Sequence, residues 1–238
     1  IDFEKLLYQA ELSNSSSRPH KTFSLMETIA RNKKEDLSPK ERNLLAISYK
    51  HIISAIRASL TKINEIYEEE SQKKDNSNLS LVLKLKNSIE NELKEACALI
   101  IDILDKHLIK NSSPDSKVFY YKLKGDYYRY LASFFTSSNY SQNAMIAYKQ
   151  ASQLSTSLSC INPIKIDLAL SYSVFLYDVV KNPDEAINIA NEALQDALNI
   201  LTEIDESEMK EATASLQMLK DNIDNWTKEQ NKESEGID

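Results

Sequence analysis

The chain has 238 residues, of which 42% are apolar and 27% charged, and it carries a formal net charge of −7. This balance is typical of a globular protein, and the acidic charge disfavours nucleic acid as a partner because phosphates require a basic surface. Only two glycines occur, Gly125 and Gly236, where average usage predicts about sixteen. Since tight β-turns, phosphate-binding loops and nucleophile elbows all need glycine, the count favours a protein built from helices and excludes those loops.

The residues that usually carry metal or catalytic chemistry are few and scattered. Cys97 and Cys160 stand in separate apolar stretches and are interpreted as unpaired thiols that pack in the core. His20, His51 and His107 form no metal-binding pair. With no nucleophile and base in view, we expect no cofactor, no metal and no enzymatic activity.

Membrane and export signals are missing from the sequence. No apolar run reaches the roughly 18 residues that a membrane span requires. No signal-peptide core opens the chain. We therefore expect a cytoplasmic protein with no membrane span.

Prolines mark the starts of several predicted helices. In "LSPKERNLL", Ser38 occupies the N-cap position, Pro39 the first helical position and Glu41 the third, which is the pattern of a capping box. The segment that follows repeats apolar residues every three or four positions over about thirty residues, which indicates one long amphipathic helix. In chain order the pattern predicts nine helices, over residues 2–14, 19–33, 39–70, 78–109, 115–135, 140–158, 163–180, 184–203 and 207–230.

Short linkers join these helices, so neighbours in sequence are expected to pack antiparallel. We predict one all-α domain over residues 1–230, followed by a flexible, acidic tail over residues 231–238. Small residues recur at Ala186, Ala190, Ala193 and Ala197, which indicates close packing between helices. A helical scaffold with a concave surface is the expected architecture.

Four polar side chains do not fit a helical core. Lys50 and Arg57 are seven residues apart, nearly two helical turns, so they share one face of the third predicted helix. Arg129 and Tyr130 are adjacent on the fifth helix, where Asp126 can fix the arginine from three residues earlier. Two arginines, a lysine and a tyrosine hydroxyl suit a phosphate dianion. From spacing alone, however, surface charges and half-buried tyrosines are the simpler interpretation.

Several segments resemble those of a known family. The segments "RNLLAISYKHIISAIRASL" (42–60) and "VFYYKLKGDYYRYLAS" (118–133) are similar to the two most characteristic segments of the 14-3-3 proteins, and "LALSYSVFLYDV" (168–179) and "LQMLKDNIDNWT" (216–227) resemble later helices of that family. The resemblance runs in order along nearly the whole chain. It implies nine antiparallel helices that form a cup-shaped protomer, with an inner groove that binds phosphoserine or phosphothreonine in an extended peptide.

The resemblance also implies roles for individual residues. Lys50, Arg57, Arg129 and Tyr130 match the family's phosphate-binding set. Ser171 stands where the family usually has asparagine, so it offers a shorter polar group to a bound peptide. The peptide groove would be lined by six residues of the seventh and last helices: Leu170, Ser171, Val174, Asp178, Asn222 and Trp226.

Family members pair through their N-terminal helices. Leu12, Arg18 and Glu92 match residues of that contact. Four neighbouring positions depart from the family pattern, namely Pro19, Lys21, Leu85 and Ser88. The resemblance therefore predicts a homodimer that is weaker than usual or differently angled.

The expected function is that of an adaptor that binds phosphorylated client proteins and regulates them in signalling, without catalysis. The alternative is a helical scaffold that binds unphosphorylated partners through a weakened groove. The acidic tail, with Ser234 between Glu233 and Glu235, is a candidate competitor for the chain's own groove because it is tethered to the last helix. Phosphorylation of Ser234 would strengthen that competition.

Overall fold

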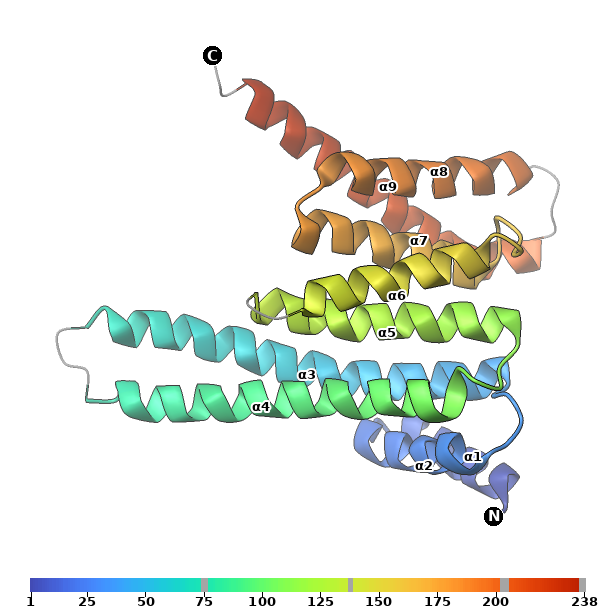
Figure 1. Cartoon of the computed structure of the whole chain (residues 1–238), viewed down its shortest axis with the longest axis horizontal. Helices are drawn as coiled ribbons and strands as arrows, with labels where there is room; N and C mark the ends of the chain where they lie inside the picture. Colours follow the sequence, from blue (N-terminus) through green and yellow to red (C-terminus); the bar gives the residue numbers. More distant parts are fainter. Residues whose placement is uncertain (74–76, 137–138, 202–205, 236–238) are drawn as a thin grey trace. The chain divides into compact units, whose positions relative to one another are not determined.

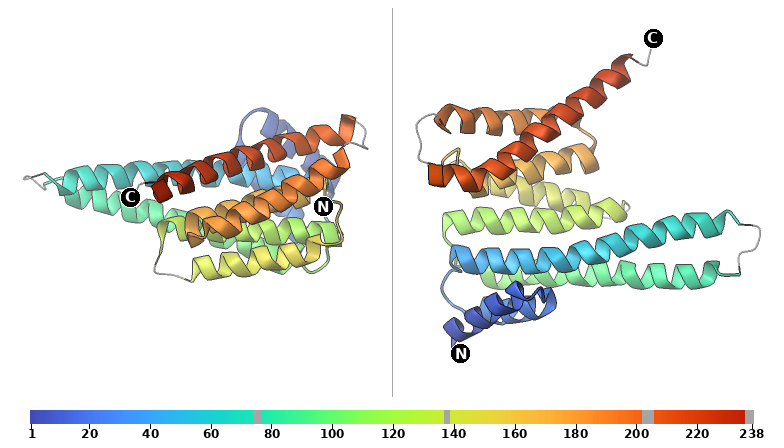
Figure 2. Two further views of the ribbon diagram at one scale, coloured as in Figure 1. Left: turned by 90° about the horizontal axis from the view of Figure 1, so that it is seen from above. Right: turned by 180° about the vertical axis from the view of Figure 1, so that it is seen from behind.

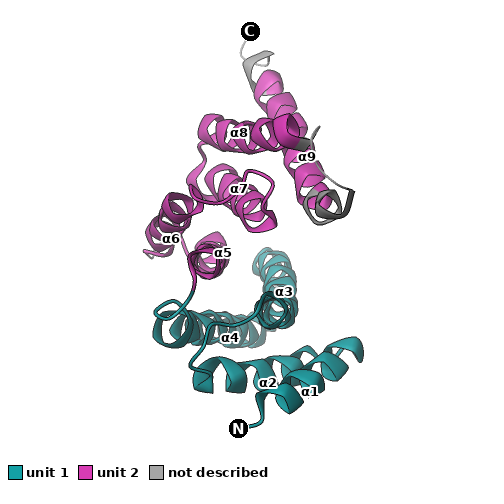
Figure 3. Cartoon of the chain, turned by 90° about the vertical axis from the view of Figure 1, so that its right-hand side faces the viewer, with its two compact units in different colours: residues 1–112 teal, residues 113–238 magenta. Residues whose placement is uncertain are grey.

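The computed structural model describes the backbone of residues 1–73, 77–136, 139–201 and 206–235, and the side chains of these residues except 201, 206–212 and 233–235. Every secondary-structure element in these ranges is a helix. The all-α fold class predicted from the sequence is therefore confirmed. The chain divides into two compact units, residues 1–112 and 113–238, which Figure 3 shows in teal and magenta.

Within its described residues, the first unit consists of four α-helices that pack in chain order. α1 (Phe3–Ser15) packs against α2 (Pro19–Asn32), α2 packs against α3 (Pro39–Ser71), and α3 packs against α4 (Leu79–Ile103). α4 runs directly into a π-helical turn, η1 (Leu104–Leu108). The views in Figure 1 and Figure 2 agree that α3 and α4 lie side by side over most of their length.

The start of α3 follows from the capping box in its sequence. The Ser38 hydroxyl accepts a hydrogen bond from the Glu41 backbone N–H at 3.3 Å, and the Glu41 carboxylate accepts one from the Ser38 N–H at 2.7 Å. Lys33 donates to both oxygens of that carboxylate, at 2.8 and 2.9 Å. Burial opposes the charge on Glu41, but these bonds outweigh it and hold the pKa of the carboxyl below its ordinary value. The capping box thereby also connects the end of α2 to the start of α3.

The core of the first unit forms where the apolar faces of α2, α3 and α4 meet. The rings of Phe23 and Tyr49 pack with their centroids 4.2 Å apart, and the Tyr49 hydroxyl donates to the backbone carbonyl of Ala96. Cys97 is fully buried beside them as an unpaired thiol, as predicted. The prediction of core packing is wrong for Cys160, which is also unpaired but only half-buried because it lies in the loop after α6. Burial raises the pKa of this thiol to about 12, against a smaller lowering by Arg57.

The second unit is organised around α7, which packs against α5, α6, α8 and α9. Figure 2 shows α9 crossing the neighbouring helices obliquely, whereas α5 and α6 run side by side. α7 runs into a second π-helical turn, η2, before α8 begins. The elements of this unit are α5 (Pro114–Phe134), α6 (Tyr140–Ser155), α7 (Pro163–Phe175), η2 (Leu176–Val180), α8 (Pro183–Leu201) and α9 (Glu206–Glu235).

Small residues allow the helices of the second unit to approach closely. Ala186, Ala190 and Ala197 on α8 have no exposed surface, and Ala193 is half-buried against the same core. They belong to one apolar cluster with the aromatic rings of Tyr148 and Phe175. The close packing predicted from these alanines is therefore confirmed.

All nine predicted helices have counterparts among the described residues, but two features differ from the prediction. α4 and α7 end in π-helical turns, which apolar periodicity does not reveal. α9 continues to Glu235, where the sequence suggests a tail from residue 231. Glutamate, glutamine and lysine are good helix formers, so a polar segment can extend an existing helix. The single domain, the cup shape and the flexibility of the tail stay predictions.

The capping box gives the first testable prediction. Ser38→Ala removes the hydroxyl that accepts the Glu41 N–H, so the free energy of unfolding should fall by about 1 kcal/mol. Ser59→Ala is the matched control on the same helix, because the Ser59 hydroxyl only donates back to the Ala55 carbonyl at 3.0 Å. The control should change the free energy by less than about 0.5 kcal/mol. Urea denaturation measures both variants, and equal losses would contradict the role given to the cap.

Candidate functional site

The candidate phosphate-binding residues of the second unit belong to a buried network of charges around α5. Asp126 is its centre. The Asp126 carboxylate lies 3.1 Å from the Lys122 ammonium and 3.5 Å from the Arg129 guanidinium, and it accepts a hydrogen bond from the Tyr148 hydroxyl at 2.7 Å. Lys122 also pairs with Asp167 on α7 at 2.5 Å, and Arg129 Nε donates to the Tyr148 hydroxyl at 3.3 Å. Arg129 is thus held by both a carboxylate and a hydroxyl.

The electrostatics of this network keep its members charged despite burial. Burial opposes the charge on Asp126, but Lys122, Arg129 and the Tyr148 hydrogen bond outweigh it and lower the pKa of the carboxyl below its ordinary value. Burial likewise opposes the charge on Lys122, but Asp126 and Asp167 raise the pKa of the ammonium above its ordinary value. Burial and Asp126 together raise the pKa of Tyr148 well above its ordinary value. At neutral pH, Asp126 is therefore a carboxylate, Lys122 and Arg129 are cations, and Tyr148 is a neutral phenol.

Gly125 makes room for this arrangement. A Cβ atom at this position would lie 2.7 Å from the Tyr148 ring, closer than side-chain contacts allow. The Tyr148 ring is also packed against Tyr172 and Phe175, with centroid distances of 5.4 and 5.3 Å. Because the ring is enclosed on several sides, its hydroxyl is fixed beside Asp126 and Arg129. The one glycine among the described residues thus has a structural reason.

Tyr130 is placed next to Arg129 by the helix and contacts it directly. The Arg129 guanidinium carbon lies 4.7 Å from the centroid of the Tyr130 ring, a cation–π contact. Arg129 donates its hydrogen bonds through Nε and Nη2. Its Nη1 has no hydrogen-bond partner among the described residues. A guanidinium fixed in this way presents a planar donor pair for an oxyanion.

Lys50 and Arg57 lie on α3, in the first unit, at positions that share one helical face. Lys50 is exposed, and its ammonium forms no hydrogen bond or ion pair with the described residues. Arg57 is half-buried and lies close enough to Cys97 to affect its pKa. Because these two residues and the pair Arg129–Tyr130 belong to different units, their convergence on one phosphate stays a prediction.

The predicted groove residues on α7 and η2 differ in exposure. Leu170 is buried in the core of the second unit. Ser171 and Val174 are half-buried on the next turns of the helix, and Asp178 is exposed in η2. The exposed and half-buried residues can contact a ligand, whereas the Leu170 side chain packs in the core.

The predicted groove residues on α9 lie one helical turn apart. Asn222 is half-buried, whereas Trp226 is almost entirely buried. The Trp226 indole stacks on the Tyr177 ring with a centroid distance of 4.6 Å and an angle of 12°. Tyr177 in turn donates a hydrogen bond to Glu229. Trp226 therefore fixes α9 against α7 and η2, a packing role that the sequence does not reveal.

The residues predicted to form a dimer contact are all exposed in the first unit. Leu12 is exposed on α1, Arg18 is exposed just before α2, and Glu92 is exposed on α4. Two further leucines lie on the same face of α4 as Glu92, namely Leu81 and Leu85, with 67% and 53% of their surface exposed. Large apolar side chains with this exposure are candidates for an interface.

Three residues of the charge network were not identified from the sequence. Tyr148 lies on α6 and Asp167 on α7, so only tertiary packing brings them to Asp126. Lys122 precedes Asp126 by one helical turn, a local signal like the spacing of Asp126 and Arg129. Ser234 lies in the helical end of α9, and its side chain is outside the described residues, so its role in the tail stays a prediction.

Among the residues that the structure describes, no group of three or more histidine, cysteine, aspartate or glutamate side chains is arranged to hold a metal ion. Within the same residues, no helix is both long and apolar enough to cross a membrane.

Comparison with known proteins matches the chain to one family. The model of the 14-3-3 protein family matches residues 9–227. The 14-3-3-like protein GF14-E of Oryza sativa subsp. japonica is 38% identical over 230 residues, which cover 94% of this chain and 88% of that protein. The 14-3-3-like protein GF14 psi of Arabidopsis thaliana is 38% identical over 97% of this chain and 93% of its own length. The 14-3-3 protein epsilon of Drosophila melanogaster is 38% identical, over 97% of this chain and 89% of its own.

The network around Asp126 gives the second prediction. Tyr148→Phe removes the hydroxyl that joins Asp126 to Arg129, so the free energy of unfolding should fall by about 1–3 kcal/mol. Tyr172→Phe is the matched control, because the Tyr172 hydroxyl contacts only the sulfur of Met145, at 3.4 Å. We expect the control to cost less than about 1 kcal/mol. Guanidinium denaturation of both variants tests this, and a Tyr148→Phe protein as stable as the control would show that the hydroxyl is not needed.

Proposed function

The chain belongs to the 14-3-3 family, and from this premise we propose that it is an adaptor that binds client proteins through a phosphorylated serine or threonine, without catalysis. The observation that carries the proposal is the fixed position of Arg129. Its guanidinium is held by Asp126 and Tyr148 and stacked on Tyr130, so little conformational entropy is lost when it binds an anion.

The proposed phosphate site consists of Lys50, Arg57, Arg129 and Tyr130. A serine phosphate carries about −1.5 to −2 charges at neutral pH and has three acceptor oxygens. The two arginines would each donate a pair of N–H groups, Lys50 would add a point charge, and the Tyr130 hydroxyl would donate one hydrogen bond. Asp126 stays outside the ligand contacts and acts by orienting Arg129.

The proposed peptide groove runs beside this site along α7 and α9. Val174 offers an apolar contact, and Ser171 and Asn222 offer polar contacts to the backbone of an extended peptide. The Ser171 side chain is shorter than an asparagine side chain and has fewer hydrogen-bonding groups. The affinity of the groove for a peptide therefore depends more on the phosphate. Asp178, at the exposed end, adds a negative charge that favours basic residues in the client.

The phosphate site gives the third prediction. Lys50→Glu reverses an exposed charge. Because the Lys50 ammonium forms no hydrogen bond or ion pair with the described residues, folding should be unaffected. Loss of a charge-assisted hydrogen bond is worth about 1.5–3 kcal/mol, which corresponds to roughly a 10- to 150-fold loss of phosphopeptide affinity. Lys110→Glu is the matched control, with the same charge change at another exposed position of the first unit. Isothermal titration with a phosphorylated peptide and its unphosphorylated form measures both variants.

Two outcomes of this titration separate the candidate functions. If the wild-type protein binds only the phosphorylated form and Lys50→Glu weakens that binding, the adaptor function is supported. If both forms bind equally well and neither variant changes the affinity, the protein is a scaffold for unphosphorylated partners. Arg129→Glu is a poorer variant for this purpose, because it would place a second carboxylate beside Asp126 and destabilise the second unit.

We also propose that the chain forms a homodimer through its first unit. The supporting observation is a set of exposed apolar side chains on α1 and α4: Tyr8, Leu12, Leu81 and Leu85. Burying these side chains against a second copy would offset part of the apolar contact area that the serine-rich segment after Leu12 does not provide. Arg18 and Glu92, which are exposed near them, are suited to ion pairs at the rim, where each contributes about 0–1 kcal/mol.

The dimer gives the fourth prediction. Leu85→Glu puts a charge into the proposed contact and should raise the dimer dissociation constant on the order of tenfold or more. Leu83→Glu is the matched control, because Leu83 is also exposed but lies about 200° around the helix from Leu85. Sedimentation equilibrium over a dilution series measures both. A wild-type protein that is monomeric at every concentration, or equal effects of both variants, would refute the proposed interface.

A further inference from the structure

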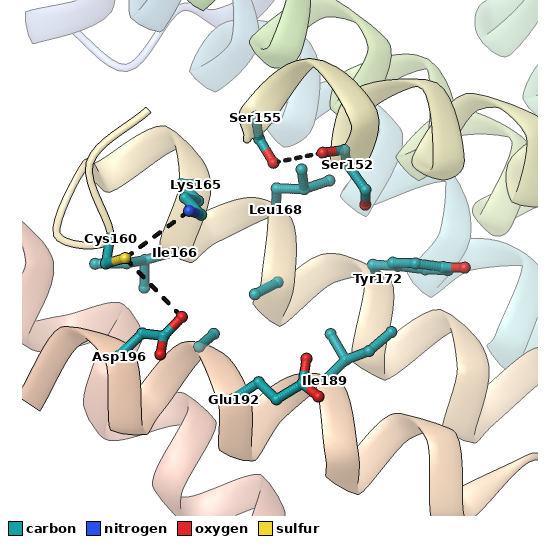
Figure 4. Close-up of a pocket in the computed structure, with 12 residues that line it drawn as sticks. Ser152, Ser155, Cys160, Lys165, Ile166, Leu168, Tyr172, Ile189, Glu192 and Asp196 are labelled. Atoms are coloured by element: carbon teal, nitrogen blue, oxygen red, sulfur yellow. Dashed lines mark hydrogen bonds between the residues drawn. The ribbon is translucent and has the colours of Figure 1, made fainter. Parts of the chain in front are cut away.

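A small cavity lies in the second unit, between α6, α7 and α8 and next to the loop that joins α6 to α7. Its volume is about 290 Å³. Figure 4 shows its lining residues, with α7 above and α8 below. The walls are mainly apolar, with Leu168, Tyr172 and Ile189 at one end. None of the residues of the proposed phosphate site or peptide groove lines this cavity.

The charged groups of the cavity are unequally distributed. At the end near the α6–α7 loop, the Cys160 sulfur lies 3.9 Å from the Lys165 ammonium and 3.9 Å from the Asp196 carboxylate. Lys165 also donates to the backbone carbonyl of Leu158 at 3.4 Å. Lys165 and Asp196 therefore place one cation and one carboxylate beside the Cys160 sulfur at this end.

Glu192 has no cation paired with it among the described residues. It lies one turn before Asp196 on α8, between Asp196 and Ile189 (Figure 4), and its side chain is exposed. No hydrogen bond or ion pair of the described residues involves its carboxylate. The apolar end of the cavity thus has a single carboxylate without a cation beside it. A ligand that fits has an apolar body and one positive charge.

We propose that this cavity binds a small organic ammonium, with an aromatic or branched aliphatic body against Tyr172, Leu168 and Ile189 and its ammonium group against Glu192. The volume is at the lower end of the roughly 300–1,000 Å³ of small-molecule sites, so the ligand has about ten heavy atoms. A ligand of that size binds with a dissociation constant of about 0.1–1 mM. This site is independent of phosphopeptide binding.

The test uses three probes of similar shape that differ in charge: 2-phenylethylamine, 2-phenylethanol and 3-phenylpropionate. NMR titration of the isotope-labelled full chain gives their affinities. We expect the amine to bind at least fivefold more tightly than the alcohol, and the carboxylate to bind most weakly. Perturbed signals should belong to α7 and α8.

Two variants identify the carboxylate. Glu192→Gln should reduce the affinity for the amine to that for the alcohol, and leave the alcohol unchanged. Asp196→Asn should have the smaller effect, because Asp196 lies at the end of the cavity that also holds a cation, Lys165. Asp224→Asn, which removes one exposed charge on α9 away from the cavity, is the matched control and should change nothing. Glu192 is exposed and unpaired with described residues, so its replacement leaves the fold intact.

Cys160 gives an independent readout of occupancy. It is half-buried at the cavity wall, whereas Cys97 is fully buried. Saturating amine should slow the reaction of Cys160 with a thiol reagent at least twofold in the wild type and not in Glu192→Gln. Cys97 should not react in the folded protein, which makes the signal specific. Equal affinity for amine and alcohol, tighter binding of the carboxylate through Lys165, or no binding of any probe would each overturn the proposal.

Discussion

The structure of the second unit depends on one buried carboxylate. Asp126 joins Lys122, Arg129 and Tyr148, and through Lys122 it also reaches Asp167 on α7. Removing one partner from such a group leaves a buried charge without compensation, which costs several kcal/mol. The network therefore fixes α5, α6 and α7 relative to one another, and it holds Arg129 in one orientation. The same interaction that stabilises the helices prepares the arginine for an anion.

This arrangement separates the residues that bind from the residues that position. We propose that Arg129 and Tyr130 contact the ligand, whereas Asp126 and Tyr148 would act by holding Arg129 in place. Gly125 has a part in this because only hydrogen fits against the Tyr148 ring. A buried charge network tolerates little change. If the chain binds clients as proposed, variation in client preference is therefore expected at half-buried positions such as Ser171, where a side chain can be exchanged without breaking the core.

The sequence predicted the helices well because helix signals are local. Ser38, Pro39 and Glu41 mark the start of α3 by their own chemistry, and apolar periodicity follows from the helix itself. Features that depend on tertiary contact were missed. Tyr148 and Asp167 come from other helices than Asp126, and no spacing rule connects them. Trp226 stacks on Tyr177 from a distant part of the chain, and the end of α9 was placed too early because a polar segment suggests a tail as readily as a helix. The resemblance to the 14-3-3 family identified the candidate residues where spacing alone favoured ordinary surface charges.

The central claim is that a phosphate dianion binds among cations that include the fixed Arg129. The measurement that tests it most directly is a pH titration of the phosphorus NMR signal of a phosphoserine peptide, free and bound to saturating protein. The second pKa of a free phosphoserine lies near 6. Nearby positive charges favour the dianion, so the account predicts a bound phosphate whose pKa is lowered by about one unit or more. A bound peptide whose phosphate keeps its free pKa would contradict the account, because its phosphate would then lie away from the cations.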